Sequence, residues 1–177
     1  MVTKMPNLDT LLMIARSELG THEDPPNSNN VKYNTWYYGH PVSGDAYPWC
    51  VVFVQWVFNF ADAPLPYRTA STSALETGYR NNYPSYIHLI PEPGDIVCYD
   101  FGHAGIVEQV NDTGTYFYAI EGNTNPGGDW DGGAVLRIGR SVNTATMTFI
   151  KPYDYDGTGG VRFRRNWKKR SLRSRIS

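Results

Sequence analysis

Cysteine is scarce in this chain, which has only Cys50 and Cys98 among 177 residues. Two thiols are too few for the disulfide framework of a small secreted domain, and at most one bridge would join them. We expect both to be free, because the sequence carries no export signal and the cytosol keeps thiols reduced. The fold must then depend on its core, and a chain of this length buries about two-thirds or more of its unfolded surface.

Long apolar runs are also missing from the start of the chain. The segment MVTKMPNLDTLLMIARSELG has charges inside a broken apolar stretch and no small-residue cleavage site. It therefore resembles neither a secretory signal peptide nor a membrane span. We expect a protein that is made in the cytoplasm without a signal peptide and that does not associate with a membrane.

The order of apolar patterns predicts helices first and strands afterwards. Helical spacing covers residues 7–20, where Asn7 is placed to cap the start and Gly20 to end it, and a second helix is expected over 71–80. From Tyr86 onward short apolar segments alternate with turns, which predicts strands over 86–90, 95–102, 103–110, 115–123, 134–140 and 146–153. This order indicates an α+β fold with N-terminal helices packed on an antiparallel meander.

We expect one domain over residues 1–153, followed by a flexible linker and a basic tail over 154–177. From Val161 the tail has 8 positive charges and no acid, whereas the other 160 residues hold 8 basic and 17 acidic groups. An acidic body therefore carries a basic extension, although the net charge of the whole chain is only −1.

The segment AYPWCVVFVQWVFNF, residues 46–60, is ambiguous. Its valines and aromatic residues favour a strand, while an uninterrupted run of about ten favours a buried helix. It follows a long connection over residues 21–48 with little periodicity, and loops of that length inside compact domains tend to be functional. Cys50, at the front of the run, is either a core thiol or a nucleophile at its edge.

A nucleophilic thiol needs a base beside it or a helix N-terminus beneath it. Among the four histidines, His103 is the best base, because the segment GHAG sets it among small residues at the start of an expected strand. Glu121 ends an apolar strand and is the candidate to orient the imidazole. Asn123, two residues further on, should face the same side as Glu121. Spacing alone makes this set a candidate only.

Three segments in this order, YPWCVVFVQWVF, PEPGDIVCYDFGHAGIVEQV and AIEGNTN, resemble the blocks of the CHAP family. These are the cysteine, histidine-dependent amidohydrolases and peptidases that cut bacterial peptidoglycan, and the resemblance covers about residues 8–151. It implies a papain-like fold in which Cys50 opens a buried helix. It also implies that Cys50 is the nucleophile and His103 the general base and later general acid. Glu121 would orient His103, and Asn123 would support the imidazole or polarise the substrate.

The resemblance implies a peptidoglycan hydrolase that works through a thioester, either an N-acetylmuramoyl-L-alanine amidase or an endopeptidase of the stem or cross-bridge. It suits a phage or prophage lysin that reaches the wall after release or from a virion. The alternative is a wall-binding or virion structural module with the same fold and no turnover. Trp36, Tyr47 and Trp49 are expected to bind the sugar and stem peptide.

No cofactor and no metal ion are expected. Some CHAP domains bind calcium through alternating aspartates before the cysteine, but the segment GHPVSGDAYPWC offers only Asp45. Asp129 and Asp131, in GGDWDGG, are interpreted as a solvated turn rather than a calcium loop. The expected partner is peptidoglycan, bound by a monomer. The tail either attracts anionic wall polymers by charge or is a solubilising extension, and we expect no nucleic acid and no membrane as partner.

Overall fold

The computed structural model describes residues 5–156. Its helices are α1 (Leu8–Ser17), α2 (Lys32–Tyr38), α3 (Cys50–Phe60) and α4 (Thr72–Asn82), followed by a 3-10 turn over Pro84–Tyr86. Its strands are β1 (Ile87–His88), β2 (Ile96–Tyr99), β3 (His103–Val110), β4 (Tyr116–Thr124), β5 (Ala134–Ser141) and β6 (Met147–Ile150). The predicted α+β class, with helices before strands, is confirmed.

The strands form one antiparallel sheet in the order β1-β6-β2-β3-β4-β5. Strands β2 to β5 make the expected meander, but β6 does not extend it. Instead β6 returns across the sheet and lies between β1 and β2, where Phe149 pairs with His88 on one side and Val97 on the other. The prediction of a simple meander was therefore wrong for the last strand, because the choice of a partner strand is a long-range contact that local pattern does not encode.

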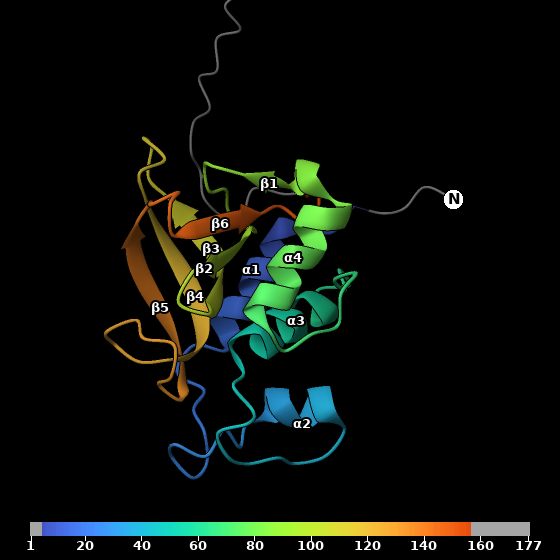
Figure 1. Ribbon diagram of the computed structural model, residues 1–177, viewed down its shortest axis with the longest axis vertical. Coiled ribbons are helices and arrows are strands. Elements are labelled where there is room, and N and C mark those ends of the chain that lie inside the picture. The colour runs from blue at the N-terminus through green and yellow to red at the C-terminus, as the bar shows by residue number, and fades with distance from the viewer. Residues whose placement is uncertain (1–4, 157–177) are drawn as a thin grey trace, which may run out of the picture.

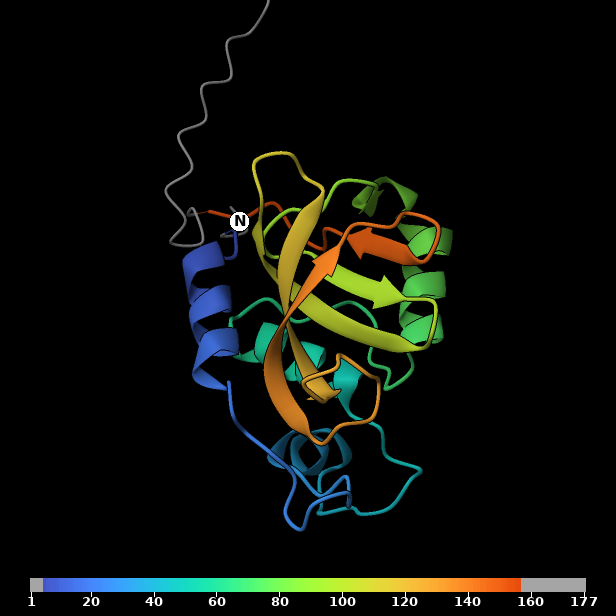
Figure 2. The ribbon, with the colours of Figure 1, turned by 90° about the vertical axis from the view of Figure 1, so that its left-hand side faces the viewer.

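Three helices cover one face of the sheet. Figures 1 and 2 show α1, α3 and α4 on this face. In Figure 2, α3 lies behind the sheet and between the other two helices, and α2 lies below α3, against which it packs. The main core packs α3 residues such as Val54 and Phe58 against Ile106 and Ile120 of the sheet. A smaller apolar cluster, centred on Phe117 and Phe149, covers the opposite face.

The ambiguous run over residues 46–60 contains helix α3, as the family resemblance implied. A helix that is apolar on nearly every side is one that is buried on nearly every side, and eight of its residues are buried. Its composition therefore hid the helical period. Helix α2 was missed altogether, because seven residues in a polar loop are too few to display a period.

The first helix begins as predicted. The Asn7 side chain accepts a hydrogen bond from the Thr10 backbone N–H at 2.9 Å, which satisfies a donor that the helix itself leaves free. Buried side chains at Leu8, Leu11 and Ala15 form one face of the helix, as the spacing indicated.

The folded body continues through Asp156, three residues beyond the predicted boundary. The Tyr155 hydroxyl donates to the Gly94 carbonyl at 2.8 Å, and the Leu8 N–H donates to the Asp156 carbonyl at 2.7 Å. Residues 154–156 therefore belong to the domain rather than to a linker. The basic tail lies outside the described residues. Within residues 5–156, no helix combines the length and the apolar character needed to cross a membrane.

Candidate active site

Cys50 is the first residue of α3, and its side chain is almost completely buried. The residue before it, Trp49, holds this end of the helix in the core. The Trp49 indole stacks on Tyr33 at 5.4 Å and donates to the Glu23 carboxylate at 2.8 Å. The thiol therefore lies at a fixed helix N-terminus, where the free backbone N–H groups favour negative charge.

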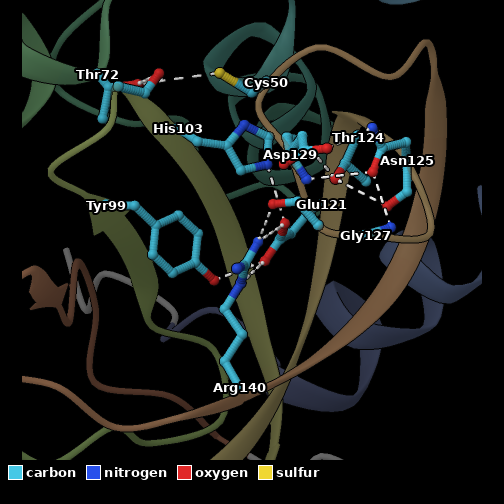
Figure 3. A network of polar contacts seen from close by, with 12 residues as sticks. Cys50, Thr72, Tyr99, His103, Glu121, Thr124, Asn125, Gly127, Asp129 and Arg140 are labelled. Atoms are coloured by element: carbon cyan, nitrogen blue, oxygen red, sulfur yellow. Dashed lines mark hydrogen bonds and ion pairs between the residues drawn. The ribbon is translucent and has the colours of Figure 1, made fainter.

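His103 opens β3 opposite Tyr99 of β2, and its ring is fully buried. The ring stacks against Tyr99 at 5.8 Å and Phe101 at 5.9 Å, and Nε2 donates to the Glu121 carboxylate at 3.0 Å. Figure 3 shows the imidazole between Cys50 and Glu121, with its other nitrogen, Nδ1, on the Cys50 side. Among the described residues Nδ1 has no hydrogen-bond partner of good geometry. The nitrogen on the thiol side is thus available for proton transfer.

Glu121 lies on β4 and is shielded completely from solvent. Besides His103, it accepts hydrogen bonds from the Tyr99 hydroxyl at 2.6 Å and from two nitrogens of Arg140 at 2.9 and 2.8 Å. Gly105 makes room for it, because a Cβ there would lie 2.7 Å from Glu121 Cγ. Gly105, two residues after His103, therefore leaves space for the carboxylate.

The surroundings of the two ionisable groups favour the charged form of each. Burial raises the pKa of Glu121, but the hydrogen bonds and charges of His103 and Arg140 outweigh it and lower that pKa. Burial likewise lowers the pKa of His103, but interactions with Cys50 and Glu121 prevail and raise it to about 9. The charged form of the ring therefore lies beside the Cys50 thiol, with the buried carboxylate on its other side.

Comparison with known families agrees with this geometry. The sequence model of the CHAP domain matches residues 42–123, a range that includes Cys50, His103, Glu121 and Asn123. Residues 42–123, a little under half of the chain, are thus similar to a CHAP domain. CHAP domains are generally peptidoglycan amidohydrolases or peptidases.

A solved structure supports the same fold. The crystal structure of a wild-type endolysin, LysIME-EF1, matches with a TM-score of 0.53 and 13% sequence identity, over 85% of this chain. The match spans 66% of the endolysin chain, just under two thirds. At this identity the likeness shows a shared fold. No curated protein matches the sequence.

Asn123, the last residue of the matched range, lies at an irregularity of β4. The register with β5 shifts between Glu121 and Thr124, and the Asn123 backbone has a φ of 56°. The simple alternation that put Asn123 on the side of Glu121 does not hold through such a shift. The Asn123 side chain is fully buried, and neither its oxygen nor its nitrogen has a partner among the described residues. Its support of the imidazole stays a prediction.

A surface cavity of about 470 Å³ opens beside the Cys50 thiol. Small or hydroxyl-bearing residues line it: Ala46, Pro48, Cys50, Thr69, Ala70, Ser71, Thr72, Ser73 and Gly102. The Thr72 hydroxyl lies 4.0 Å from Cys50 Sγ and donates to the Gly102 carbonyl at 3.2 Å (Figure 3). Sequence reasoning missed Thr72 and its neighbours, because nothing in the local pattern relates residues 69–73 to Cys50.

The predicted substrate-binding aromatic residues do not line this cavity. Trp49 is 0% exposed, so the interpretation of this residue as a substrate contact was wrong; it is a core residue. Tyr47 is partly exposed and lies between the two lining residues Ala46 and Pro48. Trp36 is partly exposed on α2, with the Arg68 guanidinium 5.2 Å from the centre of its ring.

The remaining candidates are Cys98 and the aspartates of the loop between β4 and β5. Cys98 is buried in β2 and unbridged, and burial raises the pKa of its thiol, so its interpretation as a core residue is confirmed. The Asp129 carboxylate accepts a hydrogen bond from the Asn125 side chain at 2.9 Å. Within residues 5–156, no three His, Cys, Asp or Glu side chains are grouped as a metal site would require.

Proposed function

We propose that this CHAP domain is a cysteine-dependent peptidoglycan hydrolase with Cys50, His103 and Glu121 as its catalytic residues. The observation that carries the proposal is the continuous arrangement of thiol, imidazole and buried carboxylate beside an open cavity. A module that only bound the wall would have no use for a fully buried His–Glu pair next to a thiol at a helix N-terminus. The catalytic interpretation is therefore favoured over the non-catalytic one.

The proposed reaction is acyl transfer. The Cys50 thiolate attacks the carbonyl carbon of a peptidoglycan amide, and backbone N–H groups at the start of α3 stabilise the oxyanion. The His103 imidazolium then gives its proton to the departing amine, which leaves a thioester on Cys50. The neutral imidazole next removes a proton from water, the resulting hydroxide attacks the thioester, and the carboxylate product leaves.

Glu121 contributes through His103. Its hydrogen bond to Nε2 fixes the tautomer, so that the nitrogen facing Cys50 is the one that exchanges a proton. Its negative charge also stabilises the imidazolium that forms during the reaction. Asn123 is proposed to support the same ring or to polarise the substrate once substrate enters.

The scissile bond is either the amide between N-acetylmuramic acid and L-alanine or a peptide bond of the stem or cross-bridge. The cavity lining carries no charged side chain, which suits the uncharged backbone around either bond. Tyr47 and Trp36, both partly exposed, are proposed as more distant contacts for the glycan or peptide. We propose that the chain acts as a monomer at the bacterial wall, as a phage lysin or from a virion. The tail would add charge attraction to anionic wall polymers.

Digestion of purified sacculi, followed by identification of the new chain ends, tests this function. Free L-alanine amino groups together with free muramic acid carboxyl groups would identify an amidase. New amino ends within the stem or cross-bridge would identify an endopeptidase. Sedimentation of the protein with intact sacculi, without any new chain end, would overturn the catalytic proposal in favour of a binding module.

A further inference from the structure

We infer that Arg140 and Tyr99 are positioning residues that hold Glu121 ionised and in one orientation against His103. This inference rests on the proposed function, because it concerns the same three residues, Cys50, His103 and Glu121. Tyr99 lies within the second of the three family-like segments and Arg140 lies outside all of them, and the resemblance assigns no role to either. Both touch Glu121 directly, from strands on either side of it in space.

Arg140 binds the Glu121 carboxylate through two nitrogens of its guanidinium. Its Nε lies 2.9 Å from Oε1 of Glu121 and its Nη2 lies 2.8 Å from Oε2. The same Nη2 donates to the Gly128 carbonyl at 2.7 Å, so the guanidinium also ties down the loop between β4 and β5. Only 15% of the Arg140 side chain is exposed, and its charge lies over the Tyr99 ring at 4.3 Å. A planar fork in such surroundings has little freedom to move.

The hydrogen bonds around Glu121 account for its full accepting capacity. A carboxylate offers about four lone-pair sites. Oε1 accepts from Tyr99 and Arg140, and Oε2 accepts from Arg140 and His103. The carboxylate therefore cannot rotate without breaking a bond, and the orientation that remains presents Oε2 to Nε2 of His103. Figure 3 shows Arg140 and Tyr99 meeting Glu121 on the side away from Cys50.

The positive charge of Arg140 also balances the net charge of the buried groups. A thiolate, an imidazolium and a buried carboxylate together carry a net charge of −1, which is costly away from water. The guanidinium brings the total to zero. A cation opposes the protonation of neighbouring groups. Loss of Arg140 should therefore favour proton binding by Cys50, His103 and Glu121 together, and reduce the fraction of Cys50 present as thiolate at a given pH. The titratable groups that face Glu121 among the described residues are Tyr99 of β2, His103 of β3 and Arg140 of β5.

The same strand offers a matched control. Arg137, three residues before Arg140 on β5, donates through Nε and Nη2 to the buried Glu108 carboxylate in the same forked manner. Arg16 shares that carboxylate, on the side of the sheet that α1 covers. An Arg137→Gln variant therefore removes a forked ion pair of the same kind, from a more exposed arginine, and leaves the contacts among Cys50, His103 and Glu121 intact.

The test compares Arg140→Gln, Arg140→Lys and Arg137→Gln by the pH dependence of Cys50 alkylation with iodoacetamide, located by peptide mass spectrometry. For Arg140→Gln we expect the midpoint to move to higher pH by about one unit. Arg140→Lys keeps the charge, so its alkylation midpoint should move less. The midpoint of Arg137→Gln should equal that of the wild type. On sacculi, kcat of Arg140→Gln should fall about 10- to 100-fold, the loss typical when the hydrogen-bond partner that orients a metal-bound histidine is removed, with KM little changed. A wild-type midpoint and kcat in Arg140→Gln would overturn the inference.

Folding of each variant is checked by circular dichroism. If Arg140→Gln does not fold, Tyr99→Phe and Arg140→Lys decide the matter. A kcat reduced several-fold at unchanged KM supports the inference, and wild-type kcat in both overturns it. Alkylation does not require the substrate to be known. If wild-type protein left sacculi intact, the proposed function would fail, while the shift of the alkylation midpoint would still support or overturn the role of Arg140.

Discussion

The carboxylate of Glu121 lies 3.0 Å from Nε2 of His103, and neither side chain has any exposure to solvent. An ion pair this deeply buried is maintained only when its remaining hydrogen-bonding capacity is satisfied. Here Tyr99 and Arg140 supply the missing donors on the carboxylate side. Because Nε2 of His103 is bound to Glu121, the other ring nitrogen, Nδ1, is left to exchange a proton with Cys50.

Activity should depend on pH through His103. Its pKa of about 9 means that the imidazolium is present below that pH and is lost as the pH rises through it. Because the leaving amine needs this proton, the initial rate of peptidoglycan solubilisation should fall with an inflection near pH 9. Glu121→Gln removes the carboxylate charge that raises the His103 pKa. The inflection at which the rate falls should therefore move to lower pH in this variant. An identical alkaline limb in the two proteins would contradict the role of Glu121.

Blocking the cavity should stop turnover without unfolding the protein. Ser73 is exposed on α4 and lines the cavity beside Cys50, so Ser73→Trp should fill space that the substrate needs. Thr77→Trp is the control, because Thr77 is exposed one turn further along the same helix and does not line the cavity. We expect kcat/KM on sacculi to fall at least about tenfold for the first variant, in line with loss of productive positioning. Equal activity of both variants would mean that substrate binds elsewhere.

Trp49 should matter for stability rather than for substrate binding. Trp49→Phe removes the indole donor and leaves a Glu23 oxygen without it in a buried environment. The expected cost is about 1–3 kcal/mol of unfolding free energy, measured by thermal or denaturant unfolding. Trp36→Phe, on partly exposed α2, should cost less. A raised KM for Trp49→Phe with unchanged stability would mean that Trp49 contacts the substrate.

The sequence predicted the strands well because each is short, apolar and bounded by turn residues. It could not place β6, whose neighbours β1 and β2 are distant in the chain. It also could not decide whether residues 50–60 form a strand or a helix, since a segment buried on nearly all sides shows no period. Resemblance to a family, rather than residue pattern, resolved that ambiguity.

The proposed catalytic residues could be selected from sequence, but their supporting contacts could not. Cys50, His103 and Glu121 each occupy an unusual position in a segment, which makes them visible. Arg140 looks like an ordinary charge on an alternating strand, and only the pairing of β4 with β5 brings it to Glu121. Asn123 was expected to follow strand alternation, and the shifted register at that point removes the basis of the expectation.

Release of soluble fragments from purified peptidoglycan by wild type, Cys50→Ala and Cys98→Ala tests the central claim most directly. Cys98 is the matched control, because it is the other buried, unbridged thiol. We predict that Cys50→Ala releases nothing while it unfolds at nearly the wild-type temperature, and that Cys98→Ala, although less stable, remains active. Equal release by Cys50→Ala and wild type would contradict the account.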